Sequence, residues 1–429
     1  MKLFVEESRE LPLVRAQVTL PIGGGDDASE LDGLAHFSSD LLARGAAGKS
    51  RTELDAAFDA LGTSLGVGTN HDSSSFGFSV LHEHLDAAMA LFADVLLRPD
   101  FPAKESEKLR RELAASLDEL RDDDGALAQR FFPRALYGDH PYGRSVIGNS
   151  QTLERMNSEL ARRWHERVMV KTNLVFGFAG AISAAEASAL VDGYFGHVPS
   201  HGAGEKALLS ARPALAPKTG LRLLLIDKPE RTQSQILIGQ PAPAWSHPDF
   251  LPLSIATCAF GGTFTARLMN EVRSKRGLSY GTSARLSHAR GPKALTCHVF
   301  PSLEQTAETL ELVLRLYQEW ADQGLRPDEA DFVRGYLSSS FAFQLATPED
   351  RLDLQLSIAL CGLPADYGTR YAEKVRAVSD QQIAHAMQQH LRPRDLQICI
   401  VSTADALRPR LEQAGLKFDS IETVAFDSY

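Results

Sequence analysis

One short segment near the N-terminus carries residue types at a spacing that could support metal chemistry. In the run GLAHFSSDLLARG, from Gly33 to Gly45, His36 and Asp40 are four positions apart. In a helix such a pair lies on one face, one turn apart. Imidazole and carboxylate groups both bind zinc. Ser39 precedes Asp40, and a serine hydroxyl cannot act as a general base at neutral pH. The segment therefore offers two potential ligands and no base.

A second segment, in the other half of the chain, combines a cation with a phenol. GGTFTARLMNEVRSKRGLSYG, residues 261–281, is typical of a helix that ends at Gly277 and is followed by a strand. Arg273 falls in the last helical turn, where a cation suits the helix dipole, and Tyr280 begins the strand. A fixed cation and a phenol donor can stabilise a developing negative oxygen. The alternative interpretation is a surface capping arginine and a core tyrosine.

Both segments resemble the signature segments of the pitrilysin (insulinase) family of zinc peptidases, which carries the inverted H-x-x-E-H motif. The family pattern G-x-A-H-F-x-E-H aligns with residues 33–40, and the pattern GG-x-x-x-S-R-L-x-x-x-L-R-x-x-x-G-L-x-Y aligns with residues 261–280. The resemblance covers essentially the whole chain. It implies an α+β fold with two homologous domains, each a mostly antiparallel sheet covered by helices, in a clamshell arrangement.

The chain departs from this family inside the first motif. His36 stands at the first ligand position, but Ser39 replaces the glutamate that takes a proton from zinc-bound water, and Asp40 replaces the second histidine. In the segment RRELAASLDELR, Glu112 and Glu119 match the family's paired glutamates, and Glu119 aligns with the third ligand. We expect a degenerate motif that holds no zinc tightly. A weak metal site of His36, Asp40 and Glu119 is the alternative.

Some members of this family work as two-subunit enzymes, in which one subunit carries the zinc motif and the other lacks it. The resemblance implies that this chain is the second kind, inactive alone. In this interpretation Arg273 and Tyr280 are its catalytic residues, and they hold substrate and stabilise the oxyanion at the zinc site of a homologous, zinc-bearing partner subunit that hydrolyses peptides. We expect no cofactor in this chain and zinc in the partner. The alternative is a purely structural or peptide-binding pseudo-peptidase subunit.

The elements that position these segments occur twice along the chain. Residues 61–100 and 280–320 each contain the tripeptide GTS near their start, then two runs in which apolar and polar residues alternate, then a segment with the apolar periodicity of a helix. The tetrapeptide LRPD occurs at 97–100 and again at 325–328. Hairpins with grouped helices indicate α+β layers and not a parallel βαβ sheet. We predict an N-terminal domain (1–197) with the degenerate motif, a linker (198–220) rich in Pro, Gly and Ala, and a C-terminal domain (221–429) with the Arg/Tyr pair.

The composition argues against several classes of protein. With 45 Lys+Arg against 55 Asp+Glu, the net charge of −10 argues against nucleic-acid binding. No apolar run reaches about 18 residues, so we expect no membrane span. The four cysteines are far apart and form no CxxC pair, which argues against a cysteine zinc site. The N-terminus does not read as a signal peptide, so a cytoplasmic location and a periplasmic one with the leader removed both stay open.

Overall fold

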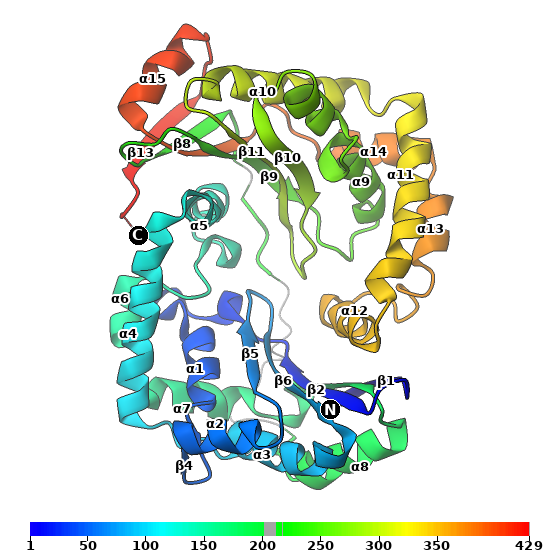
Figure 1. Cartoon of the computed structure of the whole chain (residues 1–429). Coiled ribbons are helices and arrows are strands. Elements are labelled where there is room, and N and C mark those ends of the chain that lie inside the picture. The colour runs from blue at the N-terminus through cyan, green and yellow to red at the C-terminus, as the bar shows by residue number, and fades with distance from the viewer. Residues whose placement is uncertain (201–211, 217, 429) are drawn as a thin grey trace. The chain divides into compact units, whose positions relative to one another are not determined.

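The computed structural model describes residues 1–200, 212–216 and 218–428. Their contacts group the chain into two compact units (Figure 1). As far as they are described, the first unit holds residues 1–117, 144–211 and 342–368, and the second holds 118–143, 212–341 and 369–429. This grouping by contact leaves the domain boundaries predicted above as predictions. Residues 201–211 and 217 of the predicted linker lie outside the described part of the chain.

The first unit is built on a five-stranded sheet with the order β1-β7-β2-β6-β5. Its strands are β1 (Lys2–Glu7), β2 (Leu13–Leu20), β5 (Gly66–Thr69), β6 (Ser74–Leu81) and β7 (Val175–Gly180). Only β1 and β7 pair in parallel, and the other neighbours are antiparallel. Val14, Ala16 and Val18 of β2 are buried, and Arg15 and Gln17 point to the opposite face, because successive side chains of a strand alternate between its two faces.

Helices complete the first unit, and those that pack on its sheet cover both faces. They are α1 (Leu34–Leu42), α2 (Arg51–Asp59), α3 (Leu85–Leu97), α4 (Ala103–Glu119), α6 (Ser150–Arg155), α7 (Ser158–Val168), α8 (Ala184–Phe195) and α12 (Pro348–Cys361), with a two-residue hairpin of β3 (Gly45–Ala46) and β4 (Lys49–Ser50). Edge-to-face contacts of Phe92 with Phe78 and Phe195 join α3 to the sheet and to α8.

The second unit repeats the first sheet and adds one strand. Its order is β10-β11-β9-β12-β8-β13. The strands are β8 (Arg222–Asp227), β9 (Gln235–Ala242), β10 (Ser279–Leu286), β11 (Lys293–Pro301), β12 (Gln397–Ser402) and β13 (Ser420–Ala425). With β8 to β12 matched to β1, β2, β5, β6 and β7 in chain order, the two sheets have the same strand order. The predicted α+β class with two related, mostly antiparallel sheets is confirmed. The predicted clamshell arrangement stays a prediction.

The helices of the second unit enclose an apolar core. They are α5 (Asp124–Tyr137), α9 (Phe250–Thr257), α10 (Thr306–Gln323), α11 (Pro327–Ser340), α13 (Tyr371–Ala377), α14 (Asp380–His390) and α15 (Ala404–Gln413). Phe260 and Trp320 stack with ring centroids 4.4 Å apart, and Tyr317 meets both rings edge-on. No helix in the described residues has the length and apolar content that crossing a membrane requires.

Each unit contains one helix from the other half of the sequence. Helix α12 follows the second sheet's hairpin in the chain, yet Leu352 and Leu356 pack on Val175 and Ala179 of the first sheet. A Cβ on Gly177 of β7 would lie 2.9 Å from Leu352, so glycine permits this close approach. Conversely, α5 packs on β9 and β12 of the second unit (Figure 1). These two helices explain why the compact units are discontinuous in sequence.

Two elements differ from those predicted. In place of the helix expected to end at Gly277, the structure has a π-helical turn at Met269–Ser274, preceded by another at Cys258–Gly262. Wider π turns are frequent at functional sites. The strand β13 was not predicted, because its side chains are almost all exposed and it carries no buried apolar alternation.

Candidate functional site

Helix α1 carries the degenerate motif and begins at a glycine that the fold requires. Gly33 has φ of +94°, and a Cβ there would lie 2.5 Å from the carbonyl oxygen of Ile147. The Asp27 carboxylate accepts hydrogen bonds from the backbone N–H groups of Gly33 (3.2 Å) and Ala35 (3.1 Å). It thus satisfies donors that a helix start leaves unpaired. Asp27 is a positioning residue that the sequence analysis missed.

His36 and Asp40 meet on the partly exposed side of α1, as their spacing predicts. His36 Nε2 lies 3.7 Å from Asp40 Oδ2, and their side chains are 20% and 26% exposed. Burial raises the pKa of Asp40, while His36 and then Arg44 oppose the shift. Ser39 is fully buried, and its Oγ has no hydrogen-bond partner. A hydroxyl in that position cannot activate a water on the exposed face.

The paired glutamates of α4 have separate surroundings. Glu112 binds Arg44 Nη2 at 2.6 Å, and this bond is the main cause that lowers the Glu112 pKa. Glu119 is the last residue of α4 and belongs to the second unit, beyond the first unit's boundary at Leu117. Within the described residues of the first unit, no third His, Cys, Asp or Glu completes a metal-binding cluster with His36 and Asp40. The donors that this unit supplies therefore do not fit a zinc site.

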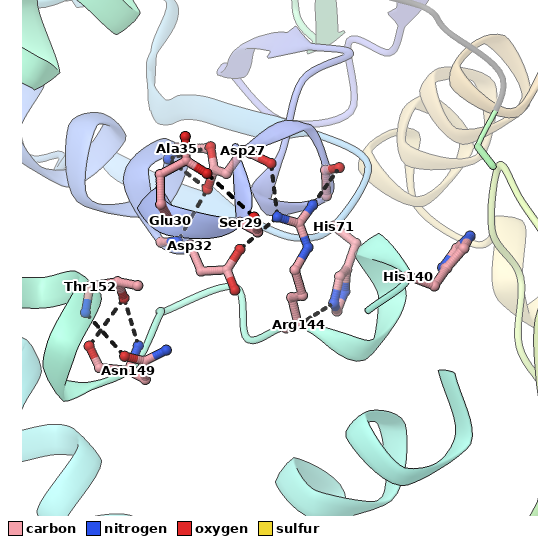
Figure 2. A network of polar contacts seen from close by, with 12 residues as sticks. Asp27, Ser29, Glu30, Asp32, Ala35, His71, His140, Arg144, Asn149 and Thr152 are labelled. Carbon is pink, nitrogen blue, oxygen red and sulfur yellow. Dashed lines mark hydrogen bonds and ion pairs between the residues drawn. The ribbon is translucent and has the colours of Figure 1, made fainter. Parts of the chain in front are cut away.

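A partly buried arginine holds the N-terminal end of this helix in place (Figure 2). Arg144 Nη1 donates to Asp32 Oδ1 at 2.7 Å and to the Asp27 backbone carbonyl at 2.9 Å. The side chains of Arg144 and Asp32 are 13% and 12% exposed. The His71 ring Nε2 lies 3.0 Å from the Arg144 carbonyl oxygen. This Asp27–Asp32–Arg144 network fixes the loop before α1 against the segment that precedes α6.

The Asp27 carboxyl gives a test of this network through pH. Burial, the largest cause, raises its pKa to about 7, and the hydrogen bond from the Ala35 N–H opposes the shift. In an unfolded chain an aspartate has a pKa of about 3.9. Between these values the folded chain binds the proton more tightly. This group therefore lowers the free energy of unfolding as pH rises through that window, by at most about 1.4 kcal/mol per pH unit.

We predict that Asp27→Asn removes this part of the pH dependence, because asparagine has the same size and does not ionise. The free energy of unfolding, measured in urea at pH 4.5, 6 and 7.5, should fall less steeply in the variant than in the wild type. Asp55→Asn, which changes an exposed carboxylate of α2, is the matched control and should keep the wild-type slope. Identical slopes in Asp27→Asn and the wild type would contradict the prediction.

The second predicted pair is brought together in the second unit. The Arg273 guanidinium carbon lies 5.0 Å from the ring centroid of Tyr280 and 4.9 Å from that of Phe264. Tyr280 is 82% exposed and Phe264 is 67% exposed. The core tyrosine of the alternative interpretation is therefore not found. Cation–π contact with two exposed rings orients the arginine while leaving the phenol accessible. The sequence analysis missed the role of Phe264.

Local backbone and one buried ion pair position this cluster. Gly277 has φ of +62° and its N–H donates to the Arg273 carbonyl at 2.9 Å, so the predicted glycine cap is present. Arg267 is bidentate to Glu329, with Nε 2.6 Å from Oε1, and also donates to the Gly324 carbonyl. The Arg267 side chain is 8% exposed and that of Glu329 is 16% exposed. Their ion pair ties the segment that carries Arg273 to the start of α11.

The glycine-rich edge of the first sheet borders an open, polar hollow. β5 is an edge strand, and Gly66 and Gly68 lie on it. The hollow has a volume of about 790 Å³ and is lined by residues of β2, β5 and β6, among them Arg15, Gln17 and Ser79. An edge strand offers unpaired N–H and C=O groups to an extended chain. The small and polar residues that line the hollow leave room for varied side chains of such an extended chain.

Comparison with known proteins places both segments in one family. Residues 3–150 match the model described as insulinase (peptidase family M16), and residues 155–335 match the peptidase M16 inactive domain. A protein of Mycobacterium tuberculosis named an uncharacterized zinc protease is 29% identical over 345 residues, which cover 78% of this chain and 76% of the relative. A non-peptidase homolog of Helicobacter pylori is 21% identical over 402 residues, covering 93% and 91%.

Solved structures show the same fold. The M16 inactive domain from Pseudomonas fluorescens superposes with a TM-score of 0.84 at 24% identity, covering 93% of this chain and 95% of that one. A protease from Helicobacter pylori gives 0.80 at 16% identity, covering 92% and 95%. At these identities the likeness concerns the fold alone.

Proposed function

Because this chain belongs to the insulinase family, peptidase family M16, we propose that it is the catalytically incomplete subunit of a heteromeric zinc peptidase. Its match to the M16 inactive domain supports a pseudo-peptidase that does not hydrolyse peptides alone. In this proposal a homologous partner subunit supplies zinc, its ligands and the general base. This chain supplies Arg273 and Tyr280 to the shared site.

The observation that carries this proposal is the contrast between the two motif segments. The first segment, on α1, has Ser39 at the position of the general base. Ser39 is buried, and its hydroxyl has no hydrogen-bond partner. The second keeps an arginine held between two exposed aromatic rings. A cation oriented before the reaction stabilises a developing oxyanion without reorganisation at the moment of reaction. An exposed Tyr280 hydroxyl can add a second donor to the same oxygen.

The edge strand supports peptide as the substrate class. Main-chain hydrogen bonds to β5 would hold an extended peptide with little dependence on its sequence. The polar hollow beside β5 suits such a ligand better than an apolar small molecule, because Arg15, Gln17 and the strand serines offer polar contacts. Peptide binding and assembly with the partner are both parts of the proposal.

Mixing tests the proposal directly. The purified chain alone should show no metal-dependent cleavage of a fluorogenic peptide, and neither should a separately purified H-x-x-E-H homologue from the same genome. The two together should cleave it and should co-elute in gel filtration. Robust hydrolysis by the single chain that is lost in His36→Ala would contradict the proposal.

A purely structural or binding subunit is the second candidate, and the name of the Helicobacter relative, a non-peptidase homolog, favours it. Under that reading the chain would stabilise the partner or bind peptide, and no side chain of its own would enter the reaction. Changes at Arg273 and Tyr280 separate the two candidates, because only the first makes the rate of the intact complex depend on them.

A further inference from the structure

A cluster of two histidines and one carboxylate lies in the second unit, outside both motif segments. His247 and Asp249 are in the turn that leads into α9, and His390 is the last residue of α14. His390 Nε2 lies 2.9 Å from Asp249 Oδ2, and His247 Nδ1 lies 3.9 Å from the same oxygen. Among the described residues, these three are the one group whose potential ligand atoms all lie within 4.8 Å of one another.

We propose that His247, Asp249 and His390 form a binding site for a divalent transition metal such as Zn²⁺. Ligands about 2.0–2.2 Å from a tetrahedral zinc lie about 3.4 Å from each other. The observed separations of 2.9 and 3.9 Å lie on either side of that value. Small rotations of the side chains therefore suffice to bring three donors around one ion, with a fourth position left for water.

The donor set favours zinc or a similar ion over calcium or magnesium. Imidazole nitrogens suit zinc, copper, iron and nickel, whereas calcium and magnesium prefer oxygen ligands. The two imidazole rings meet edge-to-face, with centroids 5.2 Å apart and an angle of 86° between their planes. His247 is exposed, and the other two residues are partly buried. Solvent can therefore reach the cluster at His247, while burial limits the side-chain motion of Asp249 and His390.

The backbone that carries His390 is fixed by a buried amide. Gln240 of β9 is 2% exposed. Its Nε2 donates to the His390 carbonyl, and its Oε1 accepts from the Tyr317 hydroxyl at 2.9 Å and from the Arg392 N–H at 2.7 Å. This arrangement sets the end of α14 opposite Asp249. The site therefore requires movement of side chains only.

Two hydrogen bonds would be exchanged when the metal binds. The first joins His390 Nε2 to Asp249 Oδ2 at 2.9 Å, and its proton would be released to solvent, because both atoms would become ligands. In the second, the Asp249 N–H donates to His247 Nδ1 at 3.1 Å, and a lone pair on that nitrogen cannot serve both partners. Asp249 is the N-cap of α9 and only partly buried, so water can satisfy its N–H. The metal would link the start of α9 to the end of α14, two helices that already pack against each other.

The test is zinc binding by the full chain, prepared without a histidine tag and dialysed against chelator. Titration calorimetry with ZnCl₂ should give one ion per chain. Loss of second-shell groups costs about 10- to 100-fold in metal affinity, so His247→Ala and His390→Ala, which each remove a ligand, should weaken binding at least tenfold. The metal should also raise the melting temperature of the wild type and much less that of His247→Ala.

Two controls decide whether the site is the one proposed. His385→Ala removes an exposed histidine of the same helix and should leave affinity and stoichiometry unchanged. His36→Ala should also leave them unchanged, whereas loss of the ion in that variant would assign it to the degenerate motif. The proposal is overturned by that result, by the lack of stoichiometric binding, or by wild-type affinity in His247→Ala. Circular dichroism confirms that each variant is folded.

Discussion

Arg273→Ala should lower kcat/KM of the assembled two-subunit complex by about 10²–10³-fold, which is the usual cost of removing one oxyanion donor. The guanidinium is held between the Phe264 and Tyr280 rings. The two rings favour this orientation before substrate binds, and Arg273→Ala removes the charge that they orient. Steady-state cleavage of a fluorogenic peptide by complex of known stoichiometry measures the effect.

Tyr280→Phe separates the roles of the ring and of the hydroxyl. The phenylalanine ring preserves the cation–π contact, so Arg273 should stay oriented. Any loss of kcat then reports the phenol as a donor to the oxyanion. The double variant Arg273→Ala/Tyr280→Phe should lose less than the product of the two single effects, because residues that act on one oxygen are not additive.

Arg276→Ala is the matched control for Arg273→Ala. Arg276 lies three residues away and pairs with Glu271 at 2.6 Å, and its side chain is 38% exposed. This control variant should retain near-wild-type activity. Gel filtration must show that all the variants still assemble with the partner. If the activity of Arg273→Ala falls only in proportion to lost complex, the purely structural reading is correct and the catalytic role is refuted.

Arg144→Met should destabilise the first unit by about 3–5 kcal/mol, the usual cost of removing one partner from a buried ion pair. Methionine fills part of the volume but leaves Asp32 as a buried, unpaired carboxylate. It also removes the donor that bonds to the Asp27 carbonyl. Urea unfolding at pH 7.5, followed by circular dichroism, should show an earlier transition.

Arg163→Met controls for the loss of a surface arginine. Arg163 pairs with Glu159 along α7, where the side chains are 69% and 61% exposed. Exposed pairs of this kind contribute about 0–1 kcal/mol. Arg144→Met and Arg163→Met should therefore differ clearly in their urea midpoints. Equal midpoints would mean that the Asp27–Asp32–Arg144 network does not stabilise the loop before α1.

The amino-acid sequence by itself determined the local features of both motif segments. The i, i+4 spacing of His36 and Asp40 placed them on one helix face, since helix geometry alone sets that relation. The glycine at position 277 ended its helical turn because it accepts a positive φ. The repeated order of strands and helices also followed from sequence, because the alternation of apolar residues depends only on which face is buried.

Only the tertiary structure decided the features that join distant segments. The exchange of α5 and α12 between the units depends on packing across the chain, and no local pattern records it. The same holds for Asp249 and His390, which are 141 residues apart and meet through the packing of α9 on α14. Arg144 likewise reaches Asp32 from 112 residues away. Periodicity reports which face is buried, whereas the partner that buries it is selected by long-range shape and charge.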